Sequence, residues 1–157
     1  MSAKKSPQQQ REYKLSDGTD MVEYQNKTKW EFTRCCLNDS DIELIGRLLP
    51  KANVTQLYLQ GNKIQNISAL KNSMPNVTTL VLDRNQIQDI SALKDSMPNV
   101  TELELHRNQI EDISALKDSM PNVIWFRLAG NLIPRSSIVE LEAHWKSLGK
   151  DERYLTF

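Results

Sequence analysis

Apolar and polar positions follow one another in a pattern that returns every 23 residues through the middle of this chain. The copies cover residues 53–75, 76–98 and 99–121, and a diverged copy starts at Asn122. Each reads V-x-x-L-x-L-x-x-N-x-I-x-x-I-x-x-L-x-x-x-M-P. Leu57 and Leu59 have the spacing of a β-strand, so they share one face while Tyr58 lies on the other. The pattern predicts one short strand at the start of each copy.

The second half of each copy is expected to form a helical turn. A serine stands where it would cap a turn that runs through Ala-Leu-Lys; the serines are Ser68, Ser91 and Ser114. A proline follows each turn and ends it; the prolines are Pro75, Pro98 and Pro121. One unit cannot bury its own Leu and Ile side chains, so the units must stack, with parallel strands about 4.8 Å apart. Each buried Leu or Ile contributes roughly 1.5 to 3 kcal/mol, and every repeat offers about six, which suffices for a core.

The signature L-x-x-L-x-L-x-x-N-x-I in three close copies resembles that of the leucine-rich-repeat superfamily, over residues 30–134. The 23-residue length looks like the internalin and phosphatase-regulator type. The resemblance implies an α/β fold: a right-handed solenoid with a parallel, concave sheet of about five strands, short helices on the convex side and a C-terminal capping helix. It also implies a buried structural ladder of asparagines that bind backbone groups, at Asn62, Asn85, Asn108 and Asn131.

The upstream end departs from this repeat. Trp30, Phe32 and Leu37 fit the same strand pattern, with Cys35 in the ladder position, and residues 41–49 indicate a longer helix. This arrangement resembles the longer ribonuclease-inhibitor type of repeat. We therefore expect Cys35 to be a buried ladder residue rather than a reactive thiol, with Cys36 more exposed.

The downstream end predicts a fifth strand and a cap. A helix is expected from Pro134 to Gly149, with one apolar face made of Ile138, Leu141, Trp145 and Leu148. We divide the chain into a polar, disordered segment (1–20), the solenoid (21–134), and the cap helix with its tail (135–157). Residues 21–28 are expected to close the other end of the solenoid, and the tail to fold back onto the helix.

Differences between the copies point to one surface. The second and third copies share 19 of 23 residues, and three of their four differences are outward strand positions: Thr79/Glu102, Val81/Glu104 and Asp83/His106. Convex positions such as Ser68, Lys71 and Ser73 recur unchanged in the second copy. We interpret the strand face as tailored to a partner. The alternative is random drift of solvated positions in recently duplicated repeats.

The expected partner-binding residues are the outward side chains of neighbouring strands: Tyr58, Gln60, Val81, Asp83, Glu102, Glu104, His106, Trp125 and Arg127. Tyr58 and Trp125 are the preferred anchors, with Arg127 next, because binding hot spots are rich in these residue types. A parallel, in-register stack places Glu104 beside Arg127 and Asp83 beside His106. Either pair would equally serve as an internal ion pair.

Composition narrows the classes of partner and of location. Twenty basic and twenty acidic residues cancel, and there is no long basic run, so nucleic acid is not expected. No stretch approaches the roughly 20 apolar residues needed for membrane insertion. The chain also lacks an apolar segment of signal-peptide type. The adjacent Cys35 and Cys36 suit a reducing compartment. We expect a cytoplasmic protein, or one delivered into a host cell by a non-classical secretion route.

Candidate chemistry is sparse. His106 with Asp83 and Glu104 would in principle form an acid/base or metal cluster, but on an open strand face rather than in a cleft. The sequence has no phosphate-binding Gly-rich loop, no paired Cys-x-x-Cys set and no nucleophile elbow. We therefore expect no catalysis, no metal and no cofactor. The predicted function is a monomeric protein-binding module; alternatives are a regulatory subunit of an enzyme such as a phosphatase, or a pathogen-type effector that engages a host protein.

Overall fold

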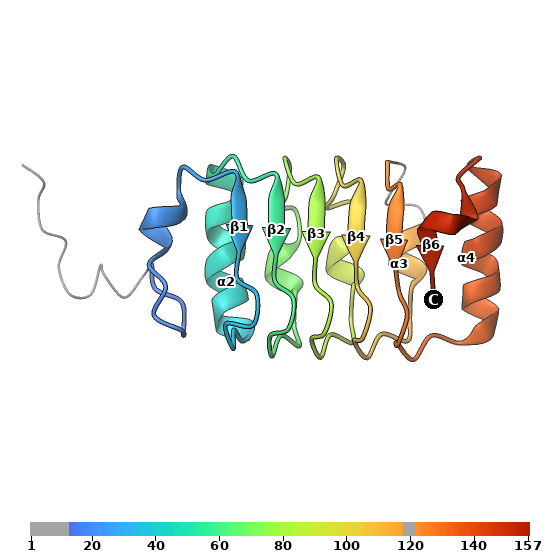
Figure 1. The fold of residues 1–157 in the computed structure, drawn as a ribbon, viewed down its shortest axis with the longest axis horizontal. Helices are drawn as coiled ribbons and strands as arrows, with labels where there is room; N and C mark the ends of the chain where they lie inside the picture. The colour runs from blue at the N-terminus through green and yellow to red at the C-terminus, as the bar shows by residue number, and fades with distance from the viewer. Residues whose placement is uncertain (1–12, 118–121) are drawn as a thin grey trace, which may run out of the picture.

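The computed structural model describes residues 13–117 and 122–157, and its strands stand side by side as one parallel sheet in chain order (Figure 1). The strands are β1 Lys29–Glu31, β2 Gln56–Tyr58, β3 Thr79–Val81, β4 Glu102–Glu104, β5 Trp125–Arg127 and β6 Leu155–Thr156. Equivalent positions of successive repeats pair directly, so that Tyr58 lies opposite Val81, and Val81 opposite Glu104. The α/β solenoid predicted from the repeat is confirmed.

The helical segments are η1 Met21–Tyr24, α2 Asp39–Leu48, η2 Leu49–Lys51, η3 Ser68–Leu70, η4 Ser91–Leu93, α3 Ser114–Lys117, α4 Arg135–Ser147 and η5 Glu152–Tyr154. Those between β1 and β5 lie behind the sheet, whereas η1 and α4 stand at its two ends (Figure 1). The 23-residue repeats leave room for only a single helical turn each, whereas the first unit carries the ten-residue α2. Within the described residues, no helix has both the length and the apolar character to cross a membrane.

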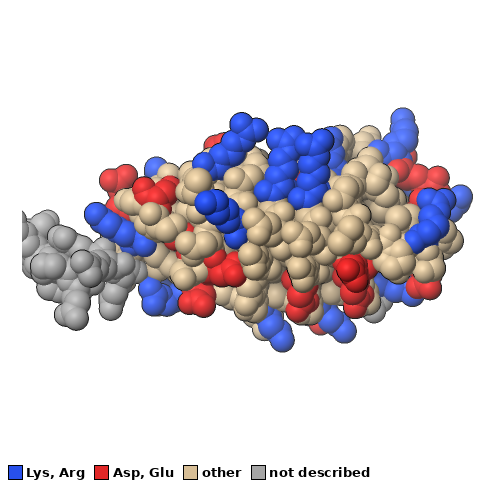
Figure 2. All heavy atoms as spheres, turned by 90° about the horizontal axis from the view of Figure 1, so that it is seen from below, with Lys and Arg blue, Asp and Glu red and all other residues tan. Residues whose placement is uncertain are grey.

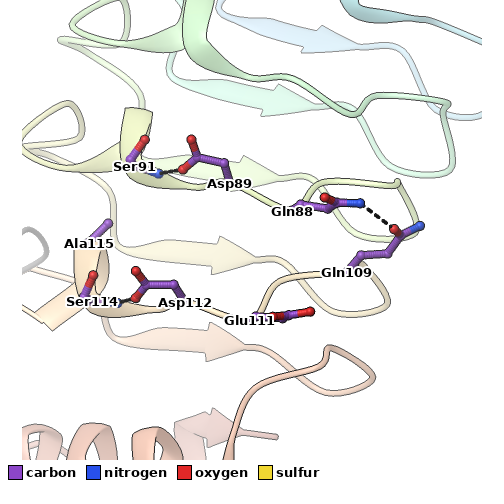
Figure 3. A pocket seen from close by; sticks show the side chains of 8 residues that line it. All are labelled: Gln88, Asp89, Ser91, Gln109, Glu111, Asp112, Ser114 and Ala115. Atoms are coloured by element: carbon purple, nitrogen blue, oxygen red, sulfur yellow. Dashed lines mark hydrogen bonds between the residues drawn. The ribbon is translucent and has the colours of Figure 1, made fainter.

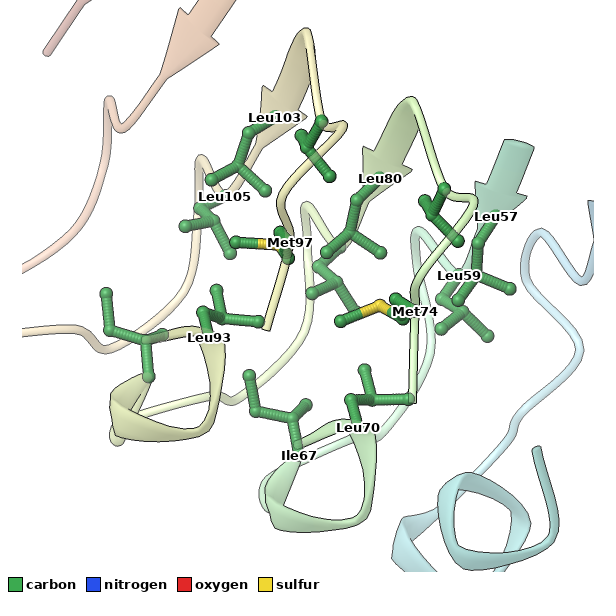
Figure 4. Close-up of a cluster of buried hydrophobic side chains, with 14 of the residues drawn as sticks. Leu57, Leu59, Ile67, Leu70, Met74, Leu80, Leu93, Met97, Leu103 and Leu105 are labelled. Carbon is green, nitrogen blue, oxygen red and sulfur yellow. The ribbon is translucent and has the colours of Figure 1, made fainter. Parts of the chain in front are cut away.

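The core is a continuous column between the sheet and the helical turns (Figure 4). Leu57 and Leu59 point inward from β2 and its continuation, Leu70 points toward them from η3, and Met74 fills the space between. All four are fully buried. Because the same side chains recur in each repeat, every repeat covers the apolar face of the one before it, which no single repeat could do alone.

The helical turns are not capped as the sequence suggested. Ser68, Ser91 and Ser114 are the first helical residues, and their backbone N–H groups donate to a side chain two residues earlier. The acceptors are Asn66, Asp89 and Asp112, at 2.7–2.8 Å. The serine caps were therefore wrong, because the Asn or Asp two positions upstream already satisfies the N–H that a cap must bind.

The N-terminal segment corrects the expected domain boundary. Leu15 is buried, and Ser16 donates both its backbone N–H and its hydroxyl to the carboxylate of Asp41 in α2. Residues 13–20 are therefore packed against the first repeat instead of disordered, because a carboxylate and an apolar site in α2 hold them. The rest of the segment expected to be disordered, residues 1–12, lies outside the described residues.

The first repeat also modifies the expectation for its cysteines. Cys35 is half-buried and Cys36 is exposed. The Cys35 thiol donates to the carbonyl of Thr33, at 3.5 Å, whereas Asn62 Oδ1 accepts the backbone N–H groups of Cys35 and Leu37. Partial burial raises the pKa of the Cys35 thiol, and the charge of Asp17 adds to this. Cys35 is thus less buried than expected, because it stands at the end of the ladder with no earlier repeat to cover it.

The C-terminal end adds a strand that the sequence did not predict. α4 ends at Ser147, and of its expected apolar face Leu141 and Trp145 are buried while Leu148 is 49% exposed. The tail then turns back and forms β6, which pairs with β5. The sheet therefore has six strands rather than about five, because the last repeat offers an unpaired edge that the tail satisfies.

The four ladder asparagines join neighbouring repeats through backbone groups. Asn85 is representative: its Oδ1 accepts the Ile64 N–H, and its Nδ2 donates to the carbonyls of Leu59 and Leu82. Asn62, Asn85 and Asn108 are buried, and Asn131, next to the last turn, is half-buried. Each side chain thereby satisfies groups of its own repeat and of the preceding one.

Candidate partner-binding face

The outward side chains of β1 to β5 and of the residues just after each strand form a single surface, which we call the strand face. Its floor is deeper than the sequence suggested. Val81 and Asp83, both predicted to contact a partner, are each only 5% exposed. The longer side chains of Tyr58 and Glu104, which flank Val81 in register, rise on either side of it. The strand face is therefore a shallow trough.

A hollow of about 470 Å³ occupies the middle of this trough. Eight of the nine residues predicted from the sequence line it: Tyr58, Gln60, Val81, Asp83, Glu102, Glu104, His106 and Arg127. Trp125 does not. The structure adds Thr33, which strand alternation places on the outward face of the first repeat, and Arg34, Gly61 and Arg84, which strand alternation alone did not select.

A charged cluster crosses the floor of the hollow. His106 Nε2 lies 3.2 Å from Asp83 Oδ2, and His106 Nδ1 lies 3.7 Å from Glu104 Oε2. Arg127 Nη1 lies 3.6 Å from Glu104 Oε1, and Arg84 Nε 3.8 Å from Asp83 Oδ2. Burial raises the pKa of the Glu104 carboxyl, an effect that Arg127 and His106 oppose. The register thus brings together the two pairs that the sequence placed side by side.

The same cluster has the composition of a metal site. Ligand atoms of Asp83, Glu104 and His106 all lie within 4.8 Å of one another, a spacing that suits a divalent cation. However, Arg84 and Arg127 already stand within 4 Å of these carboxylates. Because these guanidinium groups offset part of the negative charge, a network of ion pairs is a second explanation of the cluster.

Three buried polar atoms of residues that line this hollow make no hydrogen bond within the described part of the chain. Among the described residues, the buried side-chain atoms without a hydrogen bond are Thr33 Oγ1, Gln60 Oε1 and His106 Nδ1. All three residues line the same hollow. Folded proteins rarely leave buried polar atoms unpaired, because each costs about 1–3 kcal/mol. Their gathering at one place marks this part of the strand face as incomplete on its own.

An aromatic group closes one end of the strand face. Trp125 is 36% exposed; its ring centroid lies 5.5 Å from that of Tyr154, and Arg127 Cζ lies 4.9 Å from it. Tyr154 belongs to the tail and was not selected from the sequence, because only the return of the chain to form β6 places it here. At the other end, Tyr58 is half-buried, with Lys29 Nζ 4.8 Å from its ring.

Arginines line the edge at which the strands end. Arg34, Arg84 and Arg107 occupy the same position in their repeats, are exposed, and all have φ of 54°; we call them the arginine row. Gly61 and Gly130 occupy this position in the other repeats. Figure 2 looks onto this edge: basic side chains stand together along its upper margin over the middle of the molecule. A left-handed backbone costs a non-glycine residue about 1 kcal/mol, so arginine is not the residue that the turn prefers.

A second hollow, of 380 Å³, lies away from the strand face between the turns of neighbouring repeats (Figure 3). Asp89 and Asp112 bind the N–H groups of Ser91 and Ser114, and Gln88 Nε2 donates to Gln109 Oε1 at 3.0 Å. The Ser114 N–H lowers the pKa of Asp112. Asp89, Asp112 and Gln88 thus bind groups of the fold, which gives these three side chains a structural role.

Ser73 and its equivalent Ser96 are buried, not exposed on the convex side as the repeat pattern predicts: they are 7% and 2% exposed. Their hydroxyls donate to the backbone carbonyls of Ala69 and Lys94. Packing therefore explains why these serines recur. Lys71 and Lys94 are exposed, and their constancy still contrasts with the variation on the strand face.

Comparison with known proteins agrees with this geometry. The chain matches the family model for leucine-rich repeats (two copies) over residues 52–95 and 75–118. The solved structure of internalin C2 from Listeria monocytogenes is similar over 74% of this chain, with 31% identity and a TM-score of 0.64. A second internalin (inlF) of that bacterium is similar over 74% of the chain, with 23% identity and a TM-score of 0.52.

The matches do not extend over whole proteins. This chain spans 48% of the internalin C2 chain and 37% of the second internalin. The likeness to the second internalin concerns the fold alone. No curated protein matches the chain.

Proposed function

The chain belongs to the leucine-rich-repeat superfamily, and from this premise we propose that it is a binding module that holds a partner protein on its strand face. Solenoids of stacked repeats present extended surfaces of this kind for protein binding. The strand face is where near-identical repeats of this chain differ, at positions such as Val81/Glu104 and Asp83/His106.

One observation carries the proposal: the unpaired buried atoms of Thr33, Gln60 and His106 share a single hollow on this face. The hydroxyl can donate or accept, the amide oxygen accepts, and the imidazole nitrogen does either, according to its proton. A partner that enters the 470 Å³ hollow and displaces the side chains over these atoms would offer polar groups to all three. We expect this gain only on binding, because the fold supplies no hydrogen bond for these atoms.

The aromatic side chains at the two ends of the face are the proposed anchors. Tyr58 is half-buried and Trp125 is 36% exposed, so each keeps apolar area available at low cost in conformational entropy. Arg127 lies against Trp125 and contacts Glu104, which holds its guanidinium between the aromatic end and the charged floor. A partner would therefore contact aromatic rings at both ends and polar groups between them.

The same surface would serve either of two biological roles. A regulatory subunit of an enzyme such as a phosphatase needs a rigid face that docks on the enzyme, and an effector needs one that engages a host protein. Both roles depend on the strand face, and identification of the partner separates them.

Site-specific photocrosslinking tests the proposal. A benzophenone amino acid at position 58 is expected to crosslink a partner in the native extract, whereas the same group at position 71, on the exposed convex side, is expected to crosslink none specifically. Mass spectrometry of the adduct then identifies the partner. Equal crosslinking from both positions would contradict the assignment of the strand face.

Alanine variants give the matched energetic test. Tyr58→Ala and Trp125→Ala are expected to weaken binding of the identified partner by roughly 2 kcal/mol each, as for hot-spot residues. Their thermal midpoints should stay close to that of the parent chain, because both side chains are only partly buried. A collapse of the midpoint would instead show that they act as core residues.

A further inference from the structure

The arginine row carries positive charge that the fold does not neutralise. Within residues 13–117 and 122–157, neither Arg34 nor Arg107 makes an ion pair, and Arg84 reaches Asp83 only at 3.8 Å. The whole chain has equal numbers of basic and acidic residues. The row is therefore a local excess of charge at the edge of the strand face, and not part of a generally basic surface.

The row is held in place by the sheet. The backbone N–H groups of Arg34, Arg84 and Arg107 donate to carbonyls of the next repeat at 2.7–3.0 Å, continuing the parallel pairing beyond the strands. The stems of two arginines also lie across a glycine of the next repeat. A Cβ on Gly61 would come within 2.8 Å of Arg34 Cγ, and one on Gly130 within 3.2 Å of Arg107 Cγ. The guanidinium groups thus project from a fixed base.

The row also borders a continuous depression. Arg34 and Arg84 line the 470 Å³ hollow, and a neighbouring hollow of 420 Å³ is lined by Arg84, Arg107 and Arg127. Arg84, Arg127 and His106 are common to both hollows. A ligand lying along this edge would therefore meet the row as one surface.

We propose that the arginine row binds an acidic segment of the partner protein, an extended stretch of about five residues with Asp or Glu at alternate positions. Three strand steps of about 4.8 Å separate Arg34 from Arg107, which is about 14 Å. Side chains on one side of an extended segment recur every two residues, about 7 Å apart, so three carboxylates span the row. This inference rests on the proposed function, since the row edges the same strand face.

The floor of the trough distinguishes such a segment from a uniform polyanion. Glu102 and Glu104 face the same depression and would repel a phosphate backbone laid over it. A protein segment avoids this repulsion by placing carboxylates over the row and neutral or basic groups over the glutamates. A protein is therefore favoured over a nucleic acid.

An NMR titration of the isotope-labelled full chain tests the inference. The probe is a synthetic peptide of alternating Glu and Gly, and its control is the same peptide with Gln in place of Glu. We expect the Glu peptide to shift the amide signals of Gly61 and Gly130, which adjoin the row, and to bind at least about tenfold more tightly than the Gln peptide. Its affinity should fall by about tenfold between low and physiological ionic strength.

Glycine substitutions provide matched variants. Because Gly61 and Gly130 already occupy this position at positive φ, a triple variant with Arg34→Gly, Arg84→Gly and Arg107→Gly should fold like the parent chain. We expect it to lose at least about tenfold in affinity for the Glu peptide. A control with Lys63→Gln, Lys71→Gln and Lys94→Gln removes the same charge from other exposed positions and should change the affinity less than about twofold.

The remaining outcomes would overturn the inference. Equal losses in the arginine and lysine variants would show a general charge effect, and equal binding of an oligothymidylate would show a polyanion site. Dimerisation that the arginine variant abolishes, seen by sedimentation, would assign the row to a second copy of this chain.

The partner crosslinked from position 58 separates this inference from the proposed function. If Tyr58→Ala releases that partner and the arginine variant does not, the acidic segment is wrong and the strand face stands. If neither variant releases it, the strand-face proposal itself is wrong. Release by both supports the two together.

Discussion

The asparagine ladder and the strand face run along the same repeats, but the ladder residues are identical from repeat to repeat and the strand-face residues differ. Asn62, Asn85 and Asn108 are identical, whereas the paired positions Tyr58 and Val81 differ at every step. A ladder side chain must satisfy backbone groups of two repeats at once, so any replacement would harm both. A strand-face side chain does not have to satisfy backbone groups of two repeats. The repeats are therefore identical at positions that the fold requires, and they differ at positions that the fold does not restrict.

Burial alone does not distinguish the two surfaces. Val81 and Asp83 are as inaccessible as the ladder asparagines, yet they lie on the variable side. What differs is satisfaction: the ladder amides have all their partners inside the fold, while Gln60 and His106 each leave a buried atom unpaired. The missing hydrogen-bond partners, more than exposure, support the proposal that the strand face is a binding surface.

The largest expected effect is at the ladder. Asn85→Ala should lower the free energy of unfolding by about 3 kcal/mol, because it leaves the buried Ile64 N–H and the carbonyls of Leu59 and Leu82 short of a partner. Urea denaturation measures this. Asn131→Ala should cost less, since Asn131 is half-buried and water can replace its bonds. Equal losses of stability in the two variants would contradict the idea that the burial of the ladder explains why its residues are identical in each repeat.

A smaller effect is expected at the turns that the ladder repeats share. Asp112→Ala should lower the free energy of unfolding by about 1 kcal/mol through loss of the bond to the Ser114 N–H, and Asp112→Asn should restore most of it. Because folding lowers the pKa of Asp112, its stabilisation is present above the ordinary pKa and is lost as the pH falls through the lowered value. Denaturation curves in acid should therefore converge for parent and alanine variant.

On the strand face, removal of the Glu104 charge should raise the free energy of unfolding at neutral pH, whereas removal of the Asp112 charge should lower it. Burial raises the pKa of Glu104, so the folded chain holds this proton more firmly than the unfolded chain does. Stability must then fall as the pH rises from the ordinary value near 4.5 through the raised value. Glu104→Gln should abolish this fall and leave the variant more stable at neutral pH, by less than about 1 kcal/mol. A destabilised variant at neutral pH would make Glu104 a structural residue.

The smallest effect is expected at the arginine row. Arg84→Gly should raise the free energy of unfolding by about 0.5 kcal/mol, because glycine adopts a φ of 54° without strain but loses more conformational entropy on folding. Thermal denaturation with Arg84→Ala as control checks this, since alanine keeps the strain. A glycine variant less stable than the parent would show that the arginine supports the fold.

Much of the fold followed from the sequence because each repeat is short and repeats its contacts. The period gave the strands, and the register of a parallel stack placed His106 beside Asp83 and Arg127 beside Glu104, where the structure has them. The depth of the floor did not follow, because it depends on the length of side chains in the flanking strands. The role of Asn66, Asp89 and Asp112 was missed because a serine in first position also fits a cap.

The sequence by itself determined the repeat, its asparagine ladder and the face on which the repeats differ, since these arise from contacts within one repeat or between neighbours. Only the tertiary structure determined how the two ends of the solenoid are covered and how deep the trough of the strand face is. Ser16 binds Asp41, and Tyr154 contacts Trp125, between segments 25 or more residues apart that no periodicity of the sequence connects. The sequence contains the three arginines of the row, but only the positions of the described acidic side chains show that Arg34 and Arg107 make no ion pair with them.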